Sequence, residues 1–457
     1  MSQGLNLGGE DIGRPEPALP GLPLSWRVHR LKHVAEVMPS NVDKHARDGE
    51  VPIRLCNYTD VYYNSEITDE LEFMTSTATP GQVSRFGLRA GDTVVTKDSE
   101  TANDIAIPAY VPKTLESVVC GYHLAIIRPK EGMNGRFLTR MFESAYVRAY
   151  VESLARGLTR VGLRHETLKN LLIPVPPKEA QDRIVAFLDR ETARIDELLR
   201  EQERLLQVKA EQTEARTESI LWGQVSLKPA RDWCDFSDER TTKLVMLRFL
   251  AANIQTGPFG TQLHAHDYVE DGVPVVNPSA IGERGITLES IPRVDPNTAN
   301  RLHQYQLRAR DVVLGRRGQL GRCFAVDAEQ SGWLLGTGSM RIRTTRYLLP
   351  EFAAHVIRSR RAREYLEDAA IGSTMSNLNP EIVRALPVPH FDLVTQHEKV
   401  AEIEELLAAN AGFVDIGSQQ LVLLRERRSA LITAAVTGQL DLSDWRPPDD
   451  AALGEVA

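Results

Sequence analysis

The sequence lacks paired cysteines and long apolar runs, which several classes of protein require. Its four cysteines, Cys56, Cys120, Cys234 and Cys323, lie far apart and form no CxxC pair. This spacing argues against a disulfide framework and against a zinc knuckle, and it fits a reducing cytoplasm. No apolar run approaches the roughly 20 residues that are needed to span a bilayer, so we expect no membrane segment.

Signatures of catalysis are also missing. The chain has no GxxxxGK[ST] phosphate loop, so we expect no ATP-driven motor in it. The tetrapeptide NPSA at residues 277–280 lacks the second proline and the aromatic residue of an amino-methyltransferase loop, and LGTGSM near Gly336 is too short a glycine signal for a cofactor site. His264 and His266 have no third metal ligand at a recognisable spacing. We therefore predict no catalytic, cofactor or metal site.

Length and charge leave DNA binding open. A chain of 457 residues is too long for one ordinary hydrophobic core, so we expect two or more domains. The net charge of -8 is unfavourable for binding phosphates. Most of the net negative charge, however, lies in residues 391–457, which hold 12 Asp and Glu against 5 Lys and Arg. The amino terminus lacks the basic start and apolar stretch of a secretory signal, and we expect it to be a flexible tail.

An internal repeat of about 215 residues is the most informative feature. The segment that begins at Gln181 aligns without a gap with the segment that begins at Gln396. Three further blocks match in the same order: VPIRL from Val51 with VPVVN from Val273, LRAGDTVV from Leu88 with LRARDVVL from Leu307, and IPVP at 173–176 with LPVP at 386–389. The chain therefore holds two copies of a whole domain plus its connector.

Each connector is predicted to be a long helix. Residues 179–221 contain no Pro or Gly and carry a heptad-like apolar stripe. The second copy continues this pattern, but Gly412 and Gly417 predict a kink or a frayed turn in its middle. About 43 helical residues would span roughly 64 Å, and a helix that returns from the second domain must run antiparallel to the first. Two unrelated amphipathic surface helices remain the alternative.

The predicted fold class is α+β. Short β-rich runs precede helical stretches in each copy, and two such domains would be related by pseudo-two-fold symmetry and separated by two long antiparallel, coiled-coil-like helices. The predicted segments are a flexible tail at 1–19, a first domain at 20–177, a central spacer helix at 178–230, a second domain at 231–390, a C-terminal spacer helix at 391–443 and an acidic tail at 444–457.

Glycine- and arginine-containing loops supply candidate DNA contacts. Gly257, Pro258 and Gly260 enforce a tight loop around Phe259, which could bring backbone N–H groups close to a phosphate or base edge. Arginine can bridge guanine, and Asn or Gln can bridge adenine. An ordinary turn and solvated polar clusters remain the alternatives. The candidates are Thr256, Gly257, Pro258, Phe259, Gly260, Thr261, Arg316, Arg317, Gln319, Thr374, Ser376 and Asn377 in the second domain, and Lys97, Thr101, Arg160 and Arg164 in the first.

The chain resembles the specificity subunits of type I restriction-modification systems over residues 20–445. The resemblance rests on the duplicated layout, the GPFG loop before a Val-Pro strand, the proline hinge before each long helix, and RERRSALITAAVTGQLDL at 425–442. It implies that each domain is a target-recognition domain reading one half of a split site in double-stranded DNA. The first domain has MPSNVDKHARDGEVPIRL in place of the GPFG loop, so contacts predicted for the second domain cannot be transferred to it.

The resemblance also implies the partners. The helices would dock two modification subunits, which bind S-adenosylmethionine and methylate adenine, and restriction (motor-nuclease) subunits would join for cleavage that uses ATP and Mg. This chain would be a non-catalytic cytoplasmic subunit that binds no cofactor itself. The docking candidates are Leu188, Ile195, Leu199, Leu206, Leu421, Leu424, Arg428 and Leu431.

Two other classes of function stay open on the sequence alone. One is an enzyme, a fused methyltransferase or nuclease with unrecognised motifs, which would transfer methyl groups or cleave DNA without a partner. The other is a coiled-coil assembly protein with no role in DNA binding, which would assemble normally and show no sequence-selective protection of DNA.

Overall fold

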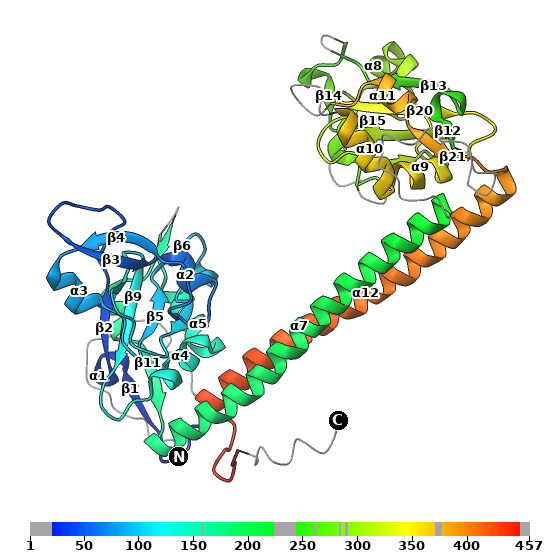
Figure 1. Ribbon diagram of the computed structural model, residues 1–457. Coiled ribbons are helices and arrows are strands. Elements are labelled where there is room, and N and C mark those ends of the chain that lie inside the picture. Colours follow the sequence, from blue (N-terminus) through cyan, green and yellow to red (C-terminus); the bar gives the residue numbers. More distant parts are fainter. Residues whose placement is uncertain are drawn as a thin grey trace. The chain divides into compact units, whose positions relative to one another are not determined.

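A computed structural model describes residues 21–157, 160–223, 244–259, 262–282, 285–287, 291–370 and 377–447. The chain divides into two compact units, one formed by Met1–Gln202 with Gln419–Ala457 and the other by Glu203–Ser418 (Figure 1). Two long helices, α7 (Lys178–Trp222) and α12 (Leu393–Val436), belong to both units: one part of each helix lies in the first unit and the other part in the second. None of the described helices combines the length and the apolarity that crossing a bilayer requires.

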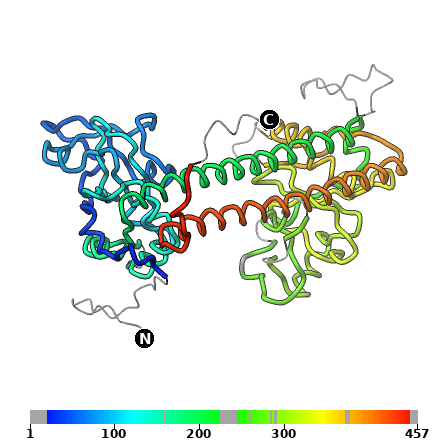
Figure 2. Tube along the Cα trace, turned by 90° about the horizontal axis from the view of Figure 1, so that it is seen from below, coloured from blue at the N-terminus to red at the C-terminus, as the bar shows by residue number. Residues whose placement is uncertain are grey.

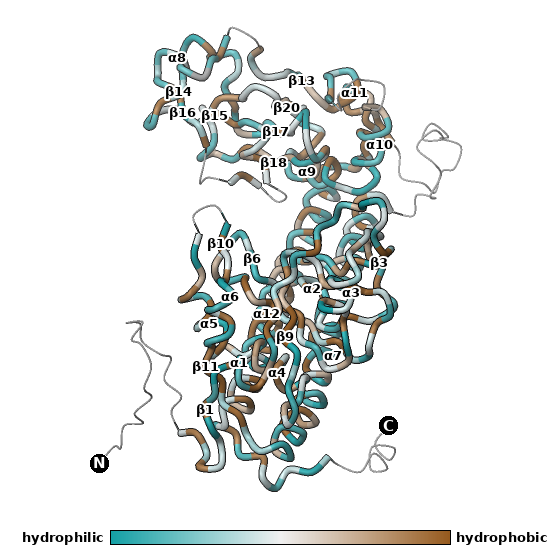
Figure 3. The backbone as a smooth tube through the Cα atoms, turned by 90° about the vertical axis from the view of Figure 1, so that its left-hand side faces the viewer, coloured by the Kyte–Doolittle hydropathy of each residue, from teal (hydrophilic) through white to brown (hydrophobic). Residues whose placement is uncertain are grey.

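The first unit is built on two sheets. A four-stranded antiparallel sheet has the order β2 (Ala35–Pro39), β9 (Leu124–Pro129), β5 (Thr93–Thr96) and β7 (Pro108–Tyr110). A three-stranded sheet has the order β4 (Met74–Ala78), β3 (Val51–Cys56) and β8 (Val118–Cys120), with β3 and β8 parallel. β9 is apolar along most of its length and lies in the core (Figure 3). Two short pairs complete the strands: β1 (Arg27–Arg30) with β11 (Leu172–Val175), and β6 (Asp98–Ser99) with β10 (Val161–Gly162).

Short helices surround these sheets. They are α1 (Leu31–Val34), α2 (Tyr58–Tyr62), α3 (Pro80–Phe86), η1 (Ala102–Asp104), α4 (Gly135–Glu143), α5 (Ala145–Leu154) and α6 (His165–Lys169). Residues 137–155 have the composition of one continuous helix, but the helix is broken at Ser144, whose backbone is extended. The hydroxyl of Ser144 accepts a hydrogen bond from the backbone N of Val147, so this residue caps α5.

The second unit has the same kind of framework. Its four-stranded antiparallel sheet has the order β13 (Ala251–Thr256), β20 (Ser339–Thr344), β17 (Asp311–Gly315) and β18 (Cys323–Ala325). The other sheet has the order β14 (Tyr268–Val269), β16 (Arg293–Val294), β15 (Val273–Val276) and β19 (Leu334–Leu335), and β12 (Leu244–Met246) pairs with β21 (Pro387–Pro389). The helices are η3 (Leu247–Phe249), η5 (Ala265–Asp267), η6 (Pro278–Ala280), α8 (Pro296–Arg301), η7 (His303–Tyr305), α9 (Pro350–Arg358), α10 (Arg360–Ala370) and α11 (Pro380–Arg384).

The matching sequence blocks form matching structure in the two units. The LRAGD and LRARD blocks each end in a fully buried aspartate, Asp92 or Asp311, which pairs with an arginine of the neighbouring strand, Arg128 or Arg343, at 2.7 Å. The proline blocks, which we expected to be extended, form β11 and β21. The side chain of Gln181 accepts from the backbone N of Asn134 at 2.8 Å, and that of Gln396 accepts from Leu349 at 2.8 Å.

Both long helices take part in the core of each unit. α7 and α12 lie alongside each other within each unit (Figures 1 and 2). In the second unit they run antiparallel, because Thr213 bonds Asn410 at 3.2 Å and Arg216 pairs with Glu402 at 3.3 Å. The first unit's core takes in Ile184, Leu188, Ile432, Ala435 and Val436, and the second unit's core takes in Ile220, Leu221, Trp222, Val400 and Ile403.

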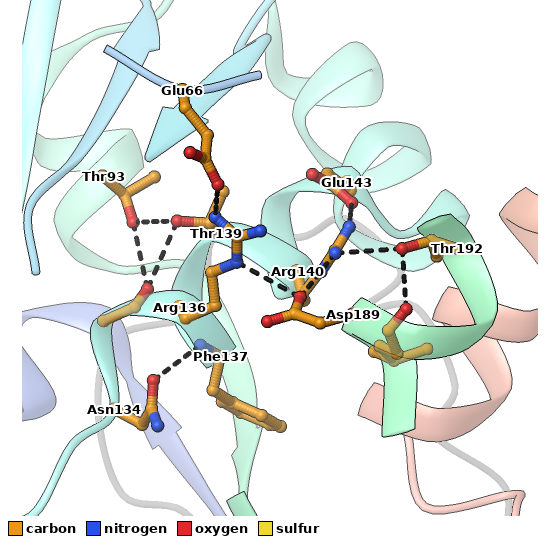
Figure 4. Close-up of polar contacts among 12 residues, drawn as sticks. Glu66, Thr93, Asn134, Arg136, Phe137, Thr139, Arg140, Glu143, Asp189 and Thr192 are labelled. Atoms are coloured by element: carbon orange, nitrogen blue, oxygen red, sulfur yellow. Dashed lines mark hydrogen bonds and ion pairs between the residues drawn. The ribbon is translucent and has the colours of Figure 1, made fainter. Parts of the chain in front are cut away.

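Polar contacts hold α7 to α4 in the first unit. The guanidinium of Arg140 binds Glu143 at 2.8 Å, Asp189 at 2.6 Å and the hydroxyl of Thr192 at 3.1 Å (Figure 4). Arg136, one turn earlier on α4, also pairs with Asp189. Because these charges are shared among several partners, α4 and the start of α7 form one packed body.

The prediction of a frayed turn at Gly412 and Gly417 is wrong. α12 continues as one helix from Leu393 to Val436. Each glycine costs about 1 kcal/mol relative to alanine, and tertiary packing along the helix outweighs that cost. The buried side chain of Asn410, bonded to Thr213, fixes α12 only two residues before Gly412.

Replacing Gln396 by alanine should lower the free energy of unfolding by about 3 kcal/mol. The buried Gln396 side chain accepts a hydrogen bond from the backbone N of Leu349 and donates to the carbonyls of Tyr347 and Phe391. Its loss leaves these three groups without that partner. The control is Gln420→Ala, at an exposed position on the same helix. Urea denaturation checks this; equal stability of the two variants would contradict it.

Candidate nucleic-acid interface

A tight loop after β13 presents an exposed aromatic ring. The backbone N of Gly257 donates to the carbonyl of Ser339 at 2.9 Å, and a Cβ at Gly257 would overlap the carbonyl of Gly336. Only glycine allows this close approach of two backbones. The carbonyl of the buried Pro258 accepts from the hydroxyl of Thr337 at 3.1 Å. With the loop held on both sides, the next residue, Phe259, remains 52% exposed.

Arg316 packs against the ring of Phe259. Its guanidinium carbon lies 5.1 Å from the ring centroid of Phe259, and its Nε donates to the carbonyl of Leu378 at 2.7 Å. Arg316 is only 7% exposed, and none of the described carboxylates is close enough to pair with it. Burial, together with the neighbouring charge of Arg317, lowers the pKa of Arg316. We conclude that Arg316 positions Phe259, whereas the exposed Arg317 is the cation available to a ligand.

Three of the loops predicted from the sequence meet here. The backbone of Leu378 donates to the carbonyl of Arg316 at 2.9 Å, which places the preceding residue, Asn377, beside the Phe259 loop. The side-chain oxygen of Asn377 is buried and has no hydrogen-bond partner among the described residues. Gln319 lies exposed in the same turn as Arg317, and Thr256 is half-buried at the end of β13. Gly260, Thr261, Thr374 and Ser376 lie outside the described residues.

Two motifs that we examined only as catalytic signatures belong to this site. Gly336, from LGTGSM, packs so closely on Asn277, from NPSA, that a Cβ would overlap the Asn277 side chain. The backbone N of Gly336 also donates to the carbonyl of Val276 at 3.0 Å. These residues build the floor beneath the Phe259 loop. Only Asn277 belongs to a matched block, VPVVN, so no signal in the sequence placed the two motifs together.

The candidates of the first domain also converge. β6 pairs with β10, and the backbone N of Leu163 donates to the carbonyl of Lys97 at 2.9 Å, so the segments holding Lys97 and Arg160 are neighbours. Arg160 is exposed. Burial raises the pKa of Tyr58, and the nearby charge of Arg160 partly offsets that rise. Thr101 is exposed and precedes η1, and Arg164 is exposed at the start of α6.

The docking candidates on the helices differ in how far they are buried. Leu188 and Ile195 are buried by this chain itself, so neither offers a surface to a partner. Arg428 pairs with Asp196 at 2.8 Å. Leu199, Leu206, Leu421, Leu424 and Leu431 are half-buried, and their role stays a prediction. The heptad stripe identified the residues that face inward. The exposed large apolar side chains of the two helices are Leu198, Leu205, Val208, Leu393, Val394, Val414, Ile416, Val422 and Leu423.

Replacing Gly336 by alanine should destabilise the second unit by about 1–3 kcal/mol, because the added methyl group overlaps Asn277 and Val276. Gly285→Ala is the control, since a Cβ there meets no atom within 4 Å. Thermal unfolding measures both variants. If they melted at the same temperature, the close packing described here would be incorrect.

Comparisons with known proteins agree with this architecture. Residues 23–208 match the family described as the type I restriction modification DNA specificity domain. The chain is 21% identical over 403 residues to the type I restriction enzyme EcoBI specificity subunit of Escherichia coli, covering 85% of this chain and 82% of that protein.

Two solved structures share the fold. A chain from a structure of a type I R-M system, which concerns complex assembly and conformational transition, has a TM-score of 0.68 at 17% identity and covers 92% of this chain and 100% of its own. The HsdS subunit from Thermoanaerobacter tengcongensis has a TM-score of 0.52 at 18% identity, with 92% and 98% covered.

Proposed function

We propose, from the premise that this chain is a type I restriction-modification specificity subunit, that it reads a bipartite, asymmetric site in double-stranded DNA. The domains at 20–177 and 231–390 act as the two target-recognition domains, related by a pseudo-two-fold axis. One observation carries the proposal: the same framework occurs twice, and its loops present different side chains in the two domains. Two domains that share one fold but carry different surface side chains suit a DNA site whose two halves differ in sequence.

The chemistry of the second domain's loop supports base reading. An exposed ring can contact a thymine methyl group, and an exposed arginine such as Arg317 can bridge guanine O6 and N7. Gln319 and Asn377 offer amide groups that match adenine in the major groove. The backbone packing beneath Phe259 holds the ring before DNA arrives, which lowers the entropic cost of binding.

The long helices serve the complex as a spacer and as a docking surface. We propose that their exposed apolar side chains, together with the half-buried candidates, bind two modification subunits, and that restriction subunits join that assembly in the cytoplasm. The chain itself takes no catalytic part and binds no cofactor. S-adenosylmethionine serves the modification subunits, and ATP with Mg serves the restriction subunits, so adenine methylation and cleavage are directed by this chain and performed by its partners.

Replacing Phe259 by alanine should weaken binding to the cognate duplex by about 5- to 150-fold, equivalent to the ~1–3 kcal/mol of a good base contact. Phe249→Ala is a matched control, because Phe249 is also an exposed ring, 66% accessible, with Arg248 4.9 Å from its centroid. Footprinting and titration of the complex assembled with modification subunits provide the measurement.

The wild-type footprint should show two protected blocks of unlike sequence separated by an unread spacer. A single contiguous palindrome would contradict the proposed function. So would methyl transfer by this chain alone, incubated with DNA and labelled S-adenosylmethionine.

A further inference from the structure

We infer that the first domain reads its half-site with Tyr122 and His123, with Lys97 positioning the ring of Tyr122, and that it uses a different loop from the second domain. This inference rests on the proposed function and names the specificity-determining residues of the domain that lacks the GPFG loop. The ligand is the base edges of one half-site in duplex DNA.

Equivalent backbone hydrogen bonds give the correspondence between the two domains. Lys97 N donates to His123 O at 3.0 Å, as Arg316 N donates to Gly338 O at 2.9 Å. Ser40 N donates to Leu124 O at 3.0 Å, as Gly257 N donates to Ser339 O at 2.9 Å, and Gly121 N donates to Cys56 O as Gly336 N donates to Val276 O. Lys97 therefore takes the place of Arg316, Ser40 that of Gly257, and Tyr122 that of Thr337.

The counterpart of the GPFG loop in the first domain faces inward. Counting from Ser40, the position that matches Phe259 is Val42, which is 1% exposed and belongs to the core. The hydroxyl of Ser40 donates to the carbonyl of Cys120 at 2.5 Å and accepts from the backbone N of Val42 at 3.2 Å, so the turn is closed on itself. This loop has no ring to present at the position of Phe259.

The exposed ring is supplied instead by the loop after β8. Tyr122 is 50% exposed, and the ammonium of Lys97 lies 5.1 Å from its ring centroid. In the second domain the cation at the same backbone position, Arg316, lies 5.1 Å from the ring of Phe259. The arrangement of a cation beneath an exposed ring is thus kept, while the ring comes from a different strand end.

His123 adds an oriented hydrogen-bonding group. Its Nδ1 lies 2.8 Å from Asp98 Oδ2, and its ring packs edge-on against Tyr122 with centroids 4.1 Å apart. In the neutral imidazole, a carboxylate at Nδ1 favours the tautomer with the proton on Nδ1, and Nε2 is then an acceptor. An acceptor beside an exposed ring suits the amino groups of adenine or cytosine.

One cavity, in the second unit, has a volume of about 370 Å³ and is lined by Arg322, Arg358 and carboxylates of α7. A separate cavity beside Tyr122, in the first domain, has a volume of about 310 Å³. The latter is bounded by His45, Asn57 and Tyr58 as well as by Tyr122 and His123. Residues of three separate segments therefore line one hollow beside the exposed ring, where a base could be received.

The test compares Tyr122→Ala and His123→Gln with Tyr63→Ala, in the complex with modification subunits. Tyr63 is a tyrosine of the same domain, 76% exposed and outside the strip that Lys97, Tyr122 and His123 form. A library of duplexes randomised over both half-sites is selected for binding and sequenced. Both strip variants should lose base preference in one half-site, with about 10-fold weaker binding to the cognate duplex, and keep the other half-site. Phe259→Ala should show the opposite pattern.

The inference is overturned if both strip variants select the same duplexes as wild type and Tyr63→Ala, or if they relax the half-site that Phe259→Ala relaxes. His123→Gln keeps the test decisive should Tyr122→Ala lower the melting temperature, because it retains a polar group in place. Failure of the proposed function has a separate signature, since the wild-type complex would then select no bipartite site at all.

Discussion

The structure depends on burial of the long helices inside the domain cores. α7 begins in the core of the first unit and ends in that of the second, and α12 runs the other way. Leu188 and Ile403 occupy matching places in the repeat and are fully buried, as are Leu221 and Val436. Truncating such side chains typically costs 2–5 kcal/mol, so domain and helix are stabilised together. The connectors are therefore part of both folded units.

Much of the fold could be predicted from the sequence, because repetition and periodicity are local signals. The matched blocks located equivalent strands, and the absence of Pro and Gly over 179–221 predicted α7. Residues that interrupt local order were harder to place. Ser144 divides a stretch with good helical periodicity through its cap, and α12 passes Gly412 and Gly417 because packing outweighs propensity. The break at Ser144 is decided by a local cap, whereas the continuity of α12 is decided by tertiary contacts.

The site was less predictable, because it is assembled from loops distant in sequence. The Phe259 loop, Arg317 and Asn377 were identified by residue type, but the burial of Arg316 under the ring required the structure. Asn277 and Gly336 contribute to the site through their close packing on each other, which residue type alone does not reveal. In the first domain, Tyr122 and His123 could not be found by aligning loops. The exposed ring of this domain follows β8, whereas the exposed ring of the second domain follows β13.

The central claim is that one chain holds two independent readers at a spacing set by its helices. The most direct test inserts one heptad into both helices at the boundary between the units, after Gln202 and after Ser418. Seven helical residues add about 10.5 Å, or about three base pairs of duplex. Mapping of methylated adenines should then show the same two half-sites with a spacer about three base pairs longer. Altered half-site sequences at an unchanged spacing would contradict the account.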